Sequence, residues 1–482
     1  MANNLKQRAV NSTVWSFANQ LLAKGISFFV QILLARLLLP EDFGLIAMVV
    51  VFINILNALS DSGMASSLLR TKNANEEDYN TVFISNFGFS IVFYAILFLL
   101  APLIANFYNE AQLTTITRIY GTIIVIQSFS TIQRAKLTRQ LEFKKLTFVE
   151  LPAVLISGLV GVVAALQGLG VWALVFMHVS LRIMDAFLFW FTTRWKPKLK
   201  IHKEKFMQHF DYGIKMSLTT VTNQVFAESY NLFIGKFYSA GTLGLYNRSY
   251  TLQNTPTLVV GRSLNRVTFP MFSDIQDDNP RLKKYYKQIA AFVMLIMGPF
   301  TLISFFTAEQ LIPALLGAQW KEAIPIFKVV IFLSLMLPII SFNLNIIKAK
   351  GLSGLVLKIN TGLKILAILL IILVLKKGIM WLVAVQVFLK FLELATNSHF
   401  AGKLINYSLF NQLFDLIKTL SFSIFAGTFS YFLITKVHLD SSFTFIAVYV
   451  SLFMIVYISL LEVSNQPDYV ALKHLVWNKI KK

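Results

Sequence analysis

Long apolar segments are the feature that most limits what this chain can fold into. Runs such as Leu45–Leu56 and Ile365–Leu375 are almost entirely apolar, whereas the strands of a membrane barrel alternate apolar and polar residues. Hydrophobic residues make up 56% of the 482-residue chain and charged residues only 14%, while soluble domains carry about 25% charged residues. The sequence therefore predicts an all-α polytopic membrane protein and excludes a soluble enzyme.

A membrane-spanning helix needs about 20 mostly apolar residues, and the chain offers about fourteen such segments. They are residues 12–35, 43–62, 81–104, 115–134, 146–167, 170–192, 210–235, 243–268, 287–307, 323–346, 354–375, 379–400, 412–434 and 442–463. We expect an N-lobe of six helices over residues 1–193, a basic cytoplasmic linker over 194–209 and a C-lobe of six helices over 210–403. Two extra C-terminal helices over 404–464 and a basic cytoplasmic tail over 465–482 would follow.

The distribution of charge predicts the orientation in the membrane. The formal net charge is +21, but nucleic-acid binding needs a polar basic surface, and most of this surface must face lipid. Loops on one side of the predicted bundle hold most of the loop Lys and Arg residues, among them Lys144, Lys145, Lys198 and Lys200. The positive-inside rule places that side, and both termini, in the cytoplasm. The absence of cysteine excludes disulfides and thiolate metal sites.

An internal repeat relates the two halves by a shift of 200 residues. The segment Gln31–Arg36 falls on Asn231–Lys236, and Gly44 falls on Gly244. Six predicted spans separate the two copies, so both enter the membrane in the same direction. The repeat is therefore expected to be parallel, with a pseudo-two-fold axis along the membrane normal, and substrate sites in such folds lie between the lobes.

Polar residues form stripes on four predicted spans. In the first span Lys24 and Gln31 belong to a stripe at helical spacing, and in the second span Asn54 and Asp61 do the same. Spans seven and eight carry similar stripes. The residues predicted to line a central, water-filled, cationic cavity are Lys24, Gln31, Asn54, Asp61, Gln224, Glu228, Asn231, Arg248, Asn254, Arg262 and Arg266.

Two alternatives stay open for these polar residues. Asn and Gln side chains also form hydrogen bonds between membrane helices, and Glu228 and Asp61 could be counter-ions, cation sites, proton carriers or structural partners of Lys24 or an arginine. Arg182 with Asp185, and Lys390 with Glu393, have the spacing of intrahelical ion pairs.

Several motifs resemble a known family. They are Leu39–Met48, Asp61–Met64, Gly170–Leu174, Leu243–Tyr250 and Val267–Ser273. These segments resemble the Wzx-type lipopolysaccharide and teichuronic-acid flippases, in the colanic-acid exporter branch of the multidrug/oligosaccharidyl-lipid/polysaccharide exporter superfamily. Of the predicted cavity residues, only Asp61 and Arg248 lie in matched motifs.

The resemblance implies fourteen helices in two lobes and alternating access. It also implies a cargo, an undecaprenyl-diphosphate-linked oligosaccharide carried from the cytoplasmic to the outer leaflet of the bacterial inner membrane, and so a transporter rather than an enzyme. Arginine guanidinium groups suit the diphosphate. No cofactor or metal site is expected, proton or sodium coupling is left open, and polysaccharide polymerase or export machinery would be the partner. The alternatives are a cation-coupled multidrug exporter and a membrane-bound sugar-polymerising enzyme.

Overall fold

The computed structural model describes residues 22–61, 63–437, 441–466, 468–470 and 473. Every regular element within these ranges is a helix, as the apolar runs predict. The chain forms two compact units, and the boundary between Asn247 and Arg248 falls inside one helix. The lobe boundaries predicted from the sequence stay a prediction.

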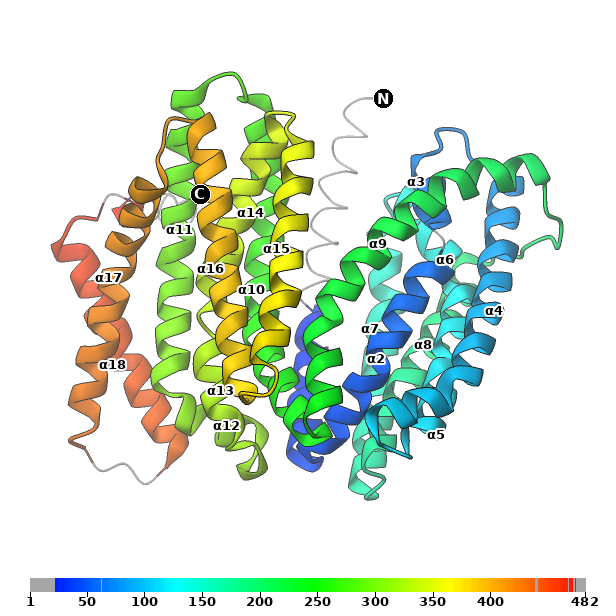
Figure 1. Cartoon of the computed structure of the whole chain (residues 1–482), viewed down its shortest axis with the longest axis horizontal. Helices are drawn as coiled ribbons and strands as arrows, with labels where there is room; N and C mark the ends of the chain where they lie inside the picture. Colours follow the sequence, from blue (N-terminus) through cyan, green and yellow to red (C-terminus); the bar gives the residue numbers. More distant parts are fainter. Residues whose placement is uncertain (1–21, 62, 438–440, 467, 471–472, 474–482) are drawn as a thin grey trace. The chain divides into compact units, whose positions relative to one another are not determined.

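Unit 1 holds a helix over residues 22–37 and the elements that follow it along the chain (Figure 1). They are α2 (Pro40–Ser60), α3 (Met64–Arg70), α4 (Glu76–Tyr108), α5 (Leu113–Gly121), α6 (Ile123–Arg139), α7 (Phe143–Leu166), α8 (Val171–Thr193), α9 (Lys203–Phe237) and the start of α10 (Ala240–Asp274). The helix α9 is long and curved and runs beside α2 (Figure 1). It begins within the predicted linker, so the connection after α8 covers only residues 194–202.

Unit 2 holds the rest of α10 and the helices after it. They are α11 (Asn279–Phe306), α12 (Ala308–Leu316), η1 (Ala318–Trp320), α13 (Ala323–Val330), α14 (Leu333–Ala349), α15 (Ser353–Val374), α16 (Ile379–Leu404), α17 (Leu409–Ile434) and α18 (Ser442–Val463). Its largest described core gathers side chains from α10, α11, α14 and α16, including the fully buried Phe272 and Phe342.

Ten helices of the described chain are long and apolar enough to cross a membrane, which makes the chain a multi-pass membrane protein. The other four predicted spans coincide with helical residues of a different character. The first lies partly outside the described residues, the fourth is interrupted at Thr122 between α5 and α6, and the seventh and eighth correspond to the polar helices α9 and α10. The count of fourteen therefore stays a prediction.

The predicted repeat is visible where two helix pairs turn. A helix ends at residue 37 and α2 begins at Pro40, and at a distance of 200 residues a helix ends at Phe237 and α10 begins at Ala240. The two turns meet inside unit 1. A Cβ on Gly44 would lie 1.7 Å from the Ala240 carbonyl oxygen, and a Cβ on Gly244 would lie 1.8 Å from that of Pro40. The contacts are reciprocal, as a two-fold relation between the copies requires.

Candidate functional site

The Glu228 carboxylate brings four of the predicted cavity residues together. Asn54 on α2 donates an amide hydrogen bond of 2.8 Å to Oε1 of Glu228, and Gln224 donates a second of 2.9 Å to the same oxygen. Asn231 donates a third, of 2.8 Å, to Oε2. Stripes that the sequence predicted on two separate helices therefore converge on one buried acid, which we call the Glu228 cluster.

The acid at the centre of the Glu228 cluster is buried, while its three amide partners are half-buried. Glu228 is 8% exposed, and the neighbouring Tyr108 is 5% exposed. The Tyr108 hydroxyl has no hydrogen-bond partner among the described residues. No described lysine or arginine forms an ion pair with Glu228, so three neutral amides stabilise its charge, and the pairing with Lys24 or an arginine is not found. A buried carboxylate held in this way ties α2 to α9.

A polar cavity of about 520 Å³ lies in unit 1 beyond the end of α2. Its walls come from α2, α3, α6, α8 and α9. Short polar side chains and amides contribute part of the lining, namely Asn57, Ser66, Gln127, Ser130, Thr131, Thr138, Ser217 and Thr220. Such groups offer hydrogen-bond donors and acceptors without net charge, which suits a ligand rich in hydroxyl groups. We call this space the unit 1 cavity.

Asp61 is the one predicted site residue that lines the unit 1 cavity. It ends α2, where its backbone N–H donates to the Asn57 carbonyl over 3.0 Å. One carboxylate oxygen, Oδ1, is buried and has no hydrogen-bond partner among the described residues. An acceptor left in this condition is costly unless a ligand or water satisfies it. Asp61 therefore adds an unused acceptor to the cavity wall.

The cationic side chains of the unit 1 cavity are Arg134 and Arg182, and both face acids. Arg134 pairs with Glu150, and its second nitrogen lies 3.5 Å from Asp185. Arg182 lies 3.5 Å from the same carboxylate. Asp185 is only 4% exposed. The predicted intrahelical pair of Arg182 and Asp185 is confirmed, as is that of Lys390 and Glu393 at 2.6 Å. The two positive charges of this cavity are thus balanced by two negative ones.

The remaining predicted residues lie in two other places. Lys24 is exposed and Gln31 half-buried on the helix over residues 22–37 of unit 1. The others belong to α10 in unit 2. There Arg248 and Asn254 are half-buried, and Arg262 and Arg266 are exposed. The cationic cleft predicted from these residues stays a prediction.

Sequence reasoning missed Arg134 and the residues before it on α6. The hydropathy pattern ends the fourth span at residue 134, so Arg134 was expected in a cytoplasmic loop, whereas α6 continues to Arg139. A usable signal was present. Gln127, Thr131, Arg134 and Thr138 repeat at i, i+4, i+7 and i+11, the same stripe spacing that identified the first span.

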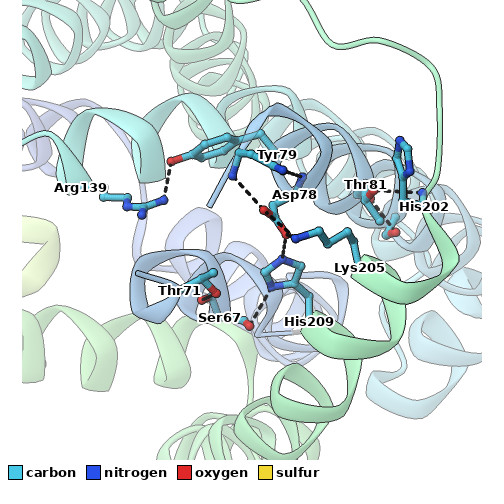
Figure 2. A network of polar contacts seen from close by, with 11 residues as sticks. Ser67, Thr71, Asp78, Tyr79, Thr81, Arg139, His202, Lys205 and His209 are labelled. Carbon is cyan, nitrogen blue, oxygen red and sulfur yellow. Dashed lines mark hydrogen bonds and ion pairs between the residues drawn. The ribbon is translucent and has the colours of Figure 1, made fainter. Parts of the chain in front are cut away.

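A buried polar network holds the start of α9 against α3 and α4 (Figure 2). His209 Nε2–H donates to Asp78 Oδ1 over 3.0 Å, and its Nδ1 lies 2.8 Å from Ser67 Oγ. Lys205 Nζ lies 3.0 Å from the same Asp78 oxygen. A serine, a histidine and an aspartate in series also occur in hydrolases. Here Asp78 and His209 are 0% exposed and Ser67 is 5% exposed. No substrate can reach them, so the network is structural.

The connection between α8 and α9 is fastened to α4 in the same region. The Lys198 backbone N–H donates to Asn80 Oδ1 over 2.9 Å, and the His202 N–H donates to Thr81 Oγ1 over 3.2 Å. The Trp195 indole packs in a buried aromatic cluster with Phe83 and donates to Glu76 Oε2 over 2.6 Å. The basic segment is therefore part of unit 1 rather than a free tether.

Comparison with known proteins finds polysaccharide biosynthesis and transport proteins. Lipopolysaccharide biosynthesis protein WzxC of Escherichia coli (strain K12) is 24% identical over 335 residues, which cover 69% of this chain and 68% of that protein. Teichuronic acid biosynthesis protein TuaB of Bacillus subtilis (strain 168) is 23% identical and covers 64% of each chain. Succinoglycan biosynthesis transport protein ExoT of Rhizobium meliloti (strain 1021) is 22% identical, covering 65% of this chain and 63% of that protein. The chain thus spans less than two thirds of the latter two.

Solved structures show the same fold. Lipid II flippase MurJ in an inward closed conformation has a TM-score of 0.70 at 14% identity, covering 95% of this chain and 99% of that one. An inward-facing multidrug resistance MATE family transporter of the MOP superfamily has a TM-score of 0.60 at 11% identity, covering 82% and 99%. The family model described as "Polysaccharide biosynthesis protein" matches residues 33–325, which is more than half of the chain. The chain therefore belongs to this polysaccharide biosynthesis protein family, as its motifs predict.

Proposed function

We propose that this protein is a flippase that carries a polyprenyl-diphosphate-linked oligosaccharide across the bacterial inner membrane by alternating access. Family membership and relatives named for polysaccharide biosynthesis and transport support this function. The observation that carries it furthest is the unit 1 cavity, a space of about 520 Å³ whose lining includes hydroxyl and amide groups from α2, α3, α6 and α9. These groups can form the hydrogen bonds that a sugar requires, which an apolar cargo does not use.

The cargo has three parts with different chemical needs. The sugar exchanges its hydrogen bonds to water for bonds to the cavity lining, so its desolvation is compensated. The diphosphate needs cations, and we assign this role to Lys24, Arg248 and the two arginines further along α10. The prenyl tail is apolar and stays among the lipid acyl chains, since moving it through a polar cavity would expose it to water.

The unit 1 cavity contributes hydrogen-bonding groups rather than an unpaired cation. Arg134 and Arg182 already face Glu150 and Asp185, so neither presents a bare cation to a phosphate. We therefore place the saccharide, and not the diphosphate, in the unit 1 cavity. Both termini lie in the cytoplasm in this proposal, because the basic loops mark the cytoplasmic side.

Translocation in proteoliposomes tests the proposal. Lys24→Ala, Arg248→Ala and Arg262→Ala would be compared with wild type for transfer of a labelled lipid-linked oligosaccharide, scored by access of a membrane-impermeant reagent to the label. Each should lower the rate roughly tenfold, because a charge-assisted hydrogen bond to phosphate is lost. Lys403→Ala removes an exposed lysine from the end of α16 and should be silent. Undiminished rates in all three well-folded variants would refute the cationic assignment.

A further inference from the structure

Unit 2 contains a cavity of its own, of about 330 Å³. It lies where the first turns of α11 and α17 meet the chain that leaves α18. Its floor is held rigidly. The Tyr286 hydroxyl donates to Gln412 Oε1 over 2.9 Å, and the Gln412 amide donates to the Tyr407 carbonyl over 3.0 Å. Tyr286 and Gln412 are both buried, so the shape of this unit 2 cavity is set before any ligand arrives.

Four charged residues line the unit 2 cavity, and they fall into two kinds. Lys287 and Asp415 form an ion pair of 2.8 Å, which the Tyr407 hydroxyl joins by donating to Asp415 over 2.5 Å. Lys418 and Asp468 also line the cavity. Among the described residues, neither of these two side chains takes part in an ion pair. Lys418 and Asp468 are therefore a cation and an anion of the lining that stand outside the ion pair of Lys287 and Asp415.

The charged side chains that line the unit 2 cavity interact electrostatically with one another. Burial raises the pKa of Asp468, and the negative charge of Asp415 raises it further, while a hydrogen bond with the Gln466 side chain and the charges of Lys287 and Lys418 lower it. These interactions place the Asp468 carboxylate within electrostatic reach of both lysines. A ligand that brought a cation to Asp468 and an anion to Lys418 would relieve the repulsion between the two acids.

The position of the cavity in the bundle restricts the ligand further. Phe422 and Leu416 form an apolar part of its wall. On the same helix Phe410, Phe414 and Ile417 are 81%, 70% and 60% exposed within the unit, as expected for a face that contacts lipid. The first turns of α11 carry Lys283 and Lys287, so the cavity lies where an apolar face meets a basic helix end. That is the depth of phospholipid headgroups.

We infer that the unit 2 cavity binds the headgroup of a zwitterionic phospholipid whose cation is a primary ammonium, a phosphoethanolamine lipid. The phosphate lies against Lys418, and the ammonium donates hydrogen bonds to Asp468. The acyl chains run along the exposed apolar face of α17. A phosphocholine headgroup has no N–H to donate, and a phosphoglycerol headgroup has no cation, so neither satisfies both residues.

Native mass spectrometry of the full chain tests this inference with defined lipids. The protein would be titrated with phosphatidylethanolamine, phosphatidylcholine and phosphatidylglycerol of matched acyl chains. Wild type should bind the ethanolamine lipid roughly threefold to tenfold more tightly than the other two, the range expected for one charge-assisted hydrogen bond. Asp468→Asn should abolish the preference over phosphatidylcholine, and Lys418→Gln should weaken all three lipids. Lys403→Gln, with an exposed lysine outside the cavity, should change nothing.

Two results would overturn the site. Equal affinity of wild type for all three lipids would mean that the cavity does not select a headgroup. An ethanolamine preference that survives Asp468→Asn would place the site elsewhere. Asp468 is half-buried and Lys418 exposed, so both variants should fold, and a circular dichroism spectrum equal to that of wild type checks this.

Discussion

Gly44 and Ala240 touch backbone to backbone, so closely that a Cβ on Gly44 would lie 1.7 Å from the Ala240 carbonyl oxygen. Gly244 meets Pro40 in the same way at 1.8 Å. These two contacts join the turns of the internal repeat within unit 1. Only glycine leaves room for them, because every other residue places an atom where the opposing carbonyl stands.

Gly44→Ala and Gly244→Ala should each lower the thermal stability of the protein. A methyl group at either position must push two helix starts apart, and overpacking of this kind costs about 1–3 kcal/mol. Thermal unfolding in detergent, followed by size-exclusion chromatography, measures the loss. Gly88→Ala is the matched control, since a Cβ on this helical glycine would meet nothing within 4 Å. Equal stability of Gly44→Ala and Gly88→Ala would contradict the close approach.

Removing one donor from the Glu228 cluster should also destabilise the fold. Asn54→Leu keeps the size of the side chain but leaves Oε1 of Glu228 with one amide instead of two, and a hydrogen bond to a buried charge contributes about 1.5–3 kcal/mol. A double-mutant cycle of Asn54→Leu with Glu228→Leu should show a coupling of that order in thermal unfolding. Ser229→Ala is the neighbouring control, because its hydroxyl bonds only within α9, to the Phe226 carbonyl. Strictly additive losses would mean that the cluster does not join α2 to α9.

Two threonines on α9, Thr220 and Thr222, allow a matched comparison of a side chain that lines the unit 1 cavity with one that does not. The hydroxyls of Thr220 and Thr222 both donate to the carbonyl four residues earlier, over 2.9 and 2.8 Å, and both residues are exposed. Only Thr220 lines the unit 1 cavity. Thr220→Val should lower oligosaccharide translocation roughly twofold to fivefold, the effect of one hydrogen bond to the cargo. Thr222→Val should leave the rate unchanged, and a similar fall in both would argue against a sugar in this cavity.

Removing the buried His209 side chain should lower the free energy of unfolding more than removing the partly exposed Lys205 side chain. His209→Phe strips Ser67 and Asp78 of a shared partner and leaves both buried, which should cost about 3 kcal/mol. Lys205→Met removes a side chain that is 28% exposed and should cost less than half as much. Thermal unfolding of the two variants gives the comparison. A larger loss for Lys205→Met would show that the ion pair, rather than the histidine, fastens α9.

The polar stripes and their facing one another could be predicted from the sequence, whereas the hydrogen bonds that join them could not. The spacing of Gln224, Glu228 and Asn231 is a local property of one helix, so the sequence alone places them on one face. That Asn54 of α2 meets the same carboxylate depends on how two distant helices are set against each other, which no local pattern encodes. The start of α9 was placed too late for a related reason. His209 reads as part of a basic linker until Asp78, which is 131 residues away, is known to face it.

The hydroxyl-rich lining of the unit 1 cavity bears on how such proteins change their cargo over evolutionary time. Of the cavity-lining side chains, those of Ser66 and Thr220 are exposed, so replacing either of them leaves no buried polar atom without a partner. The bundle then keeps its stability while its preference among glycans drifts. Lineages that diversify their surface polymers can therefore change the sugar preference of the unit 1 cavity by single substitutions in its lining, without further substitutions in the helices around it.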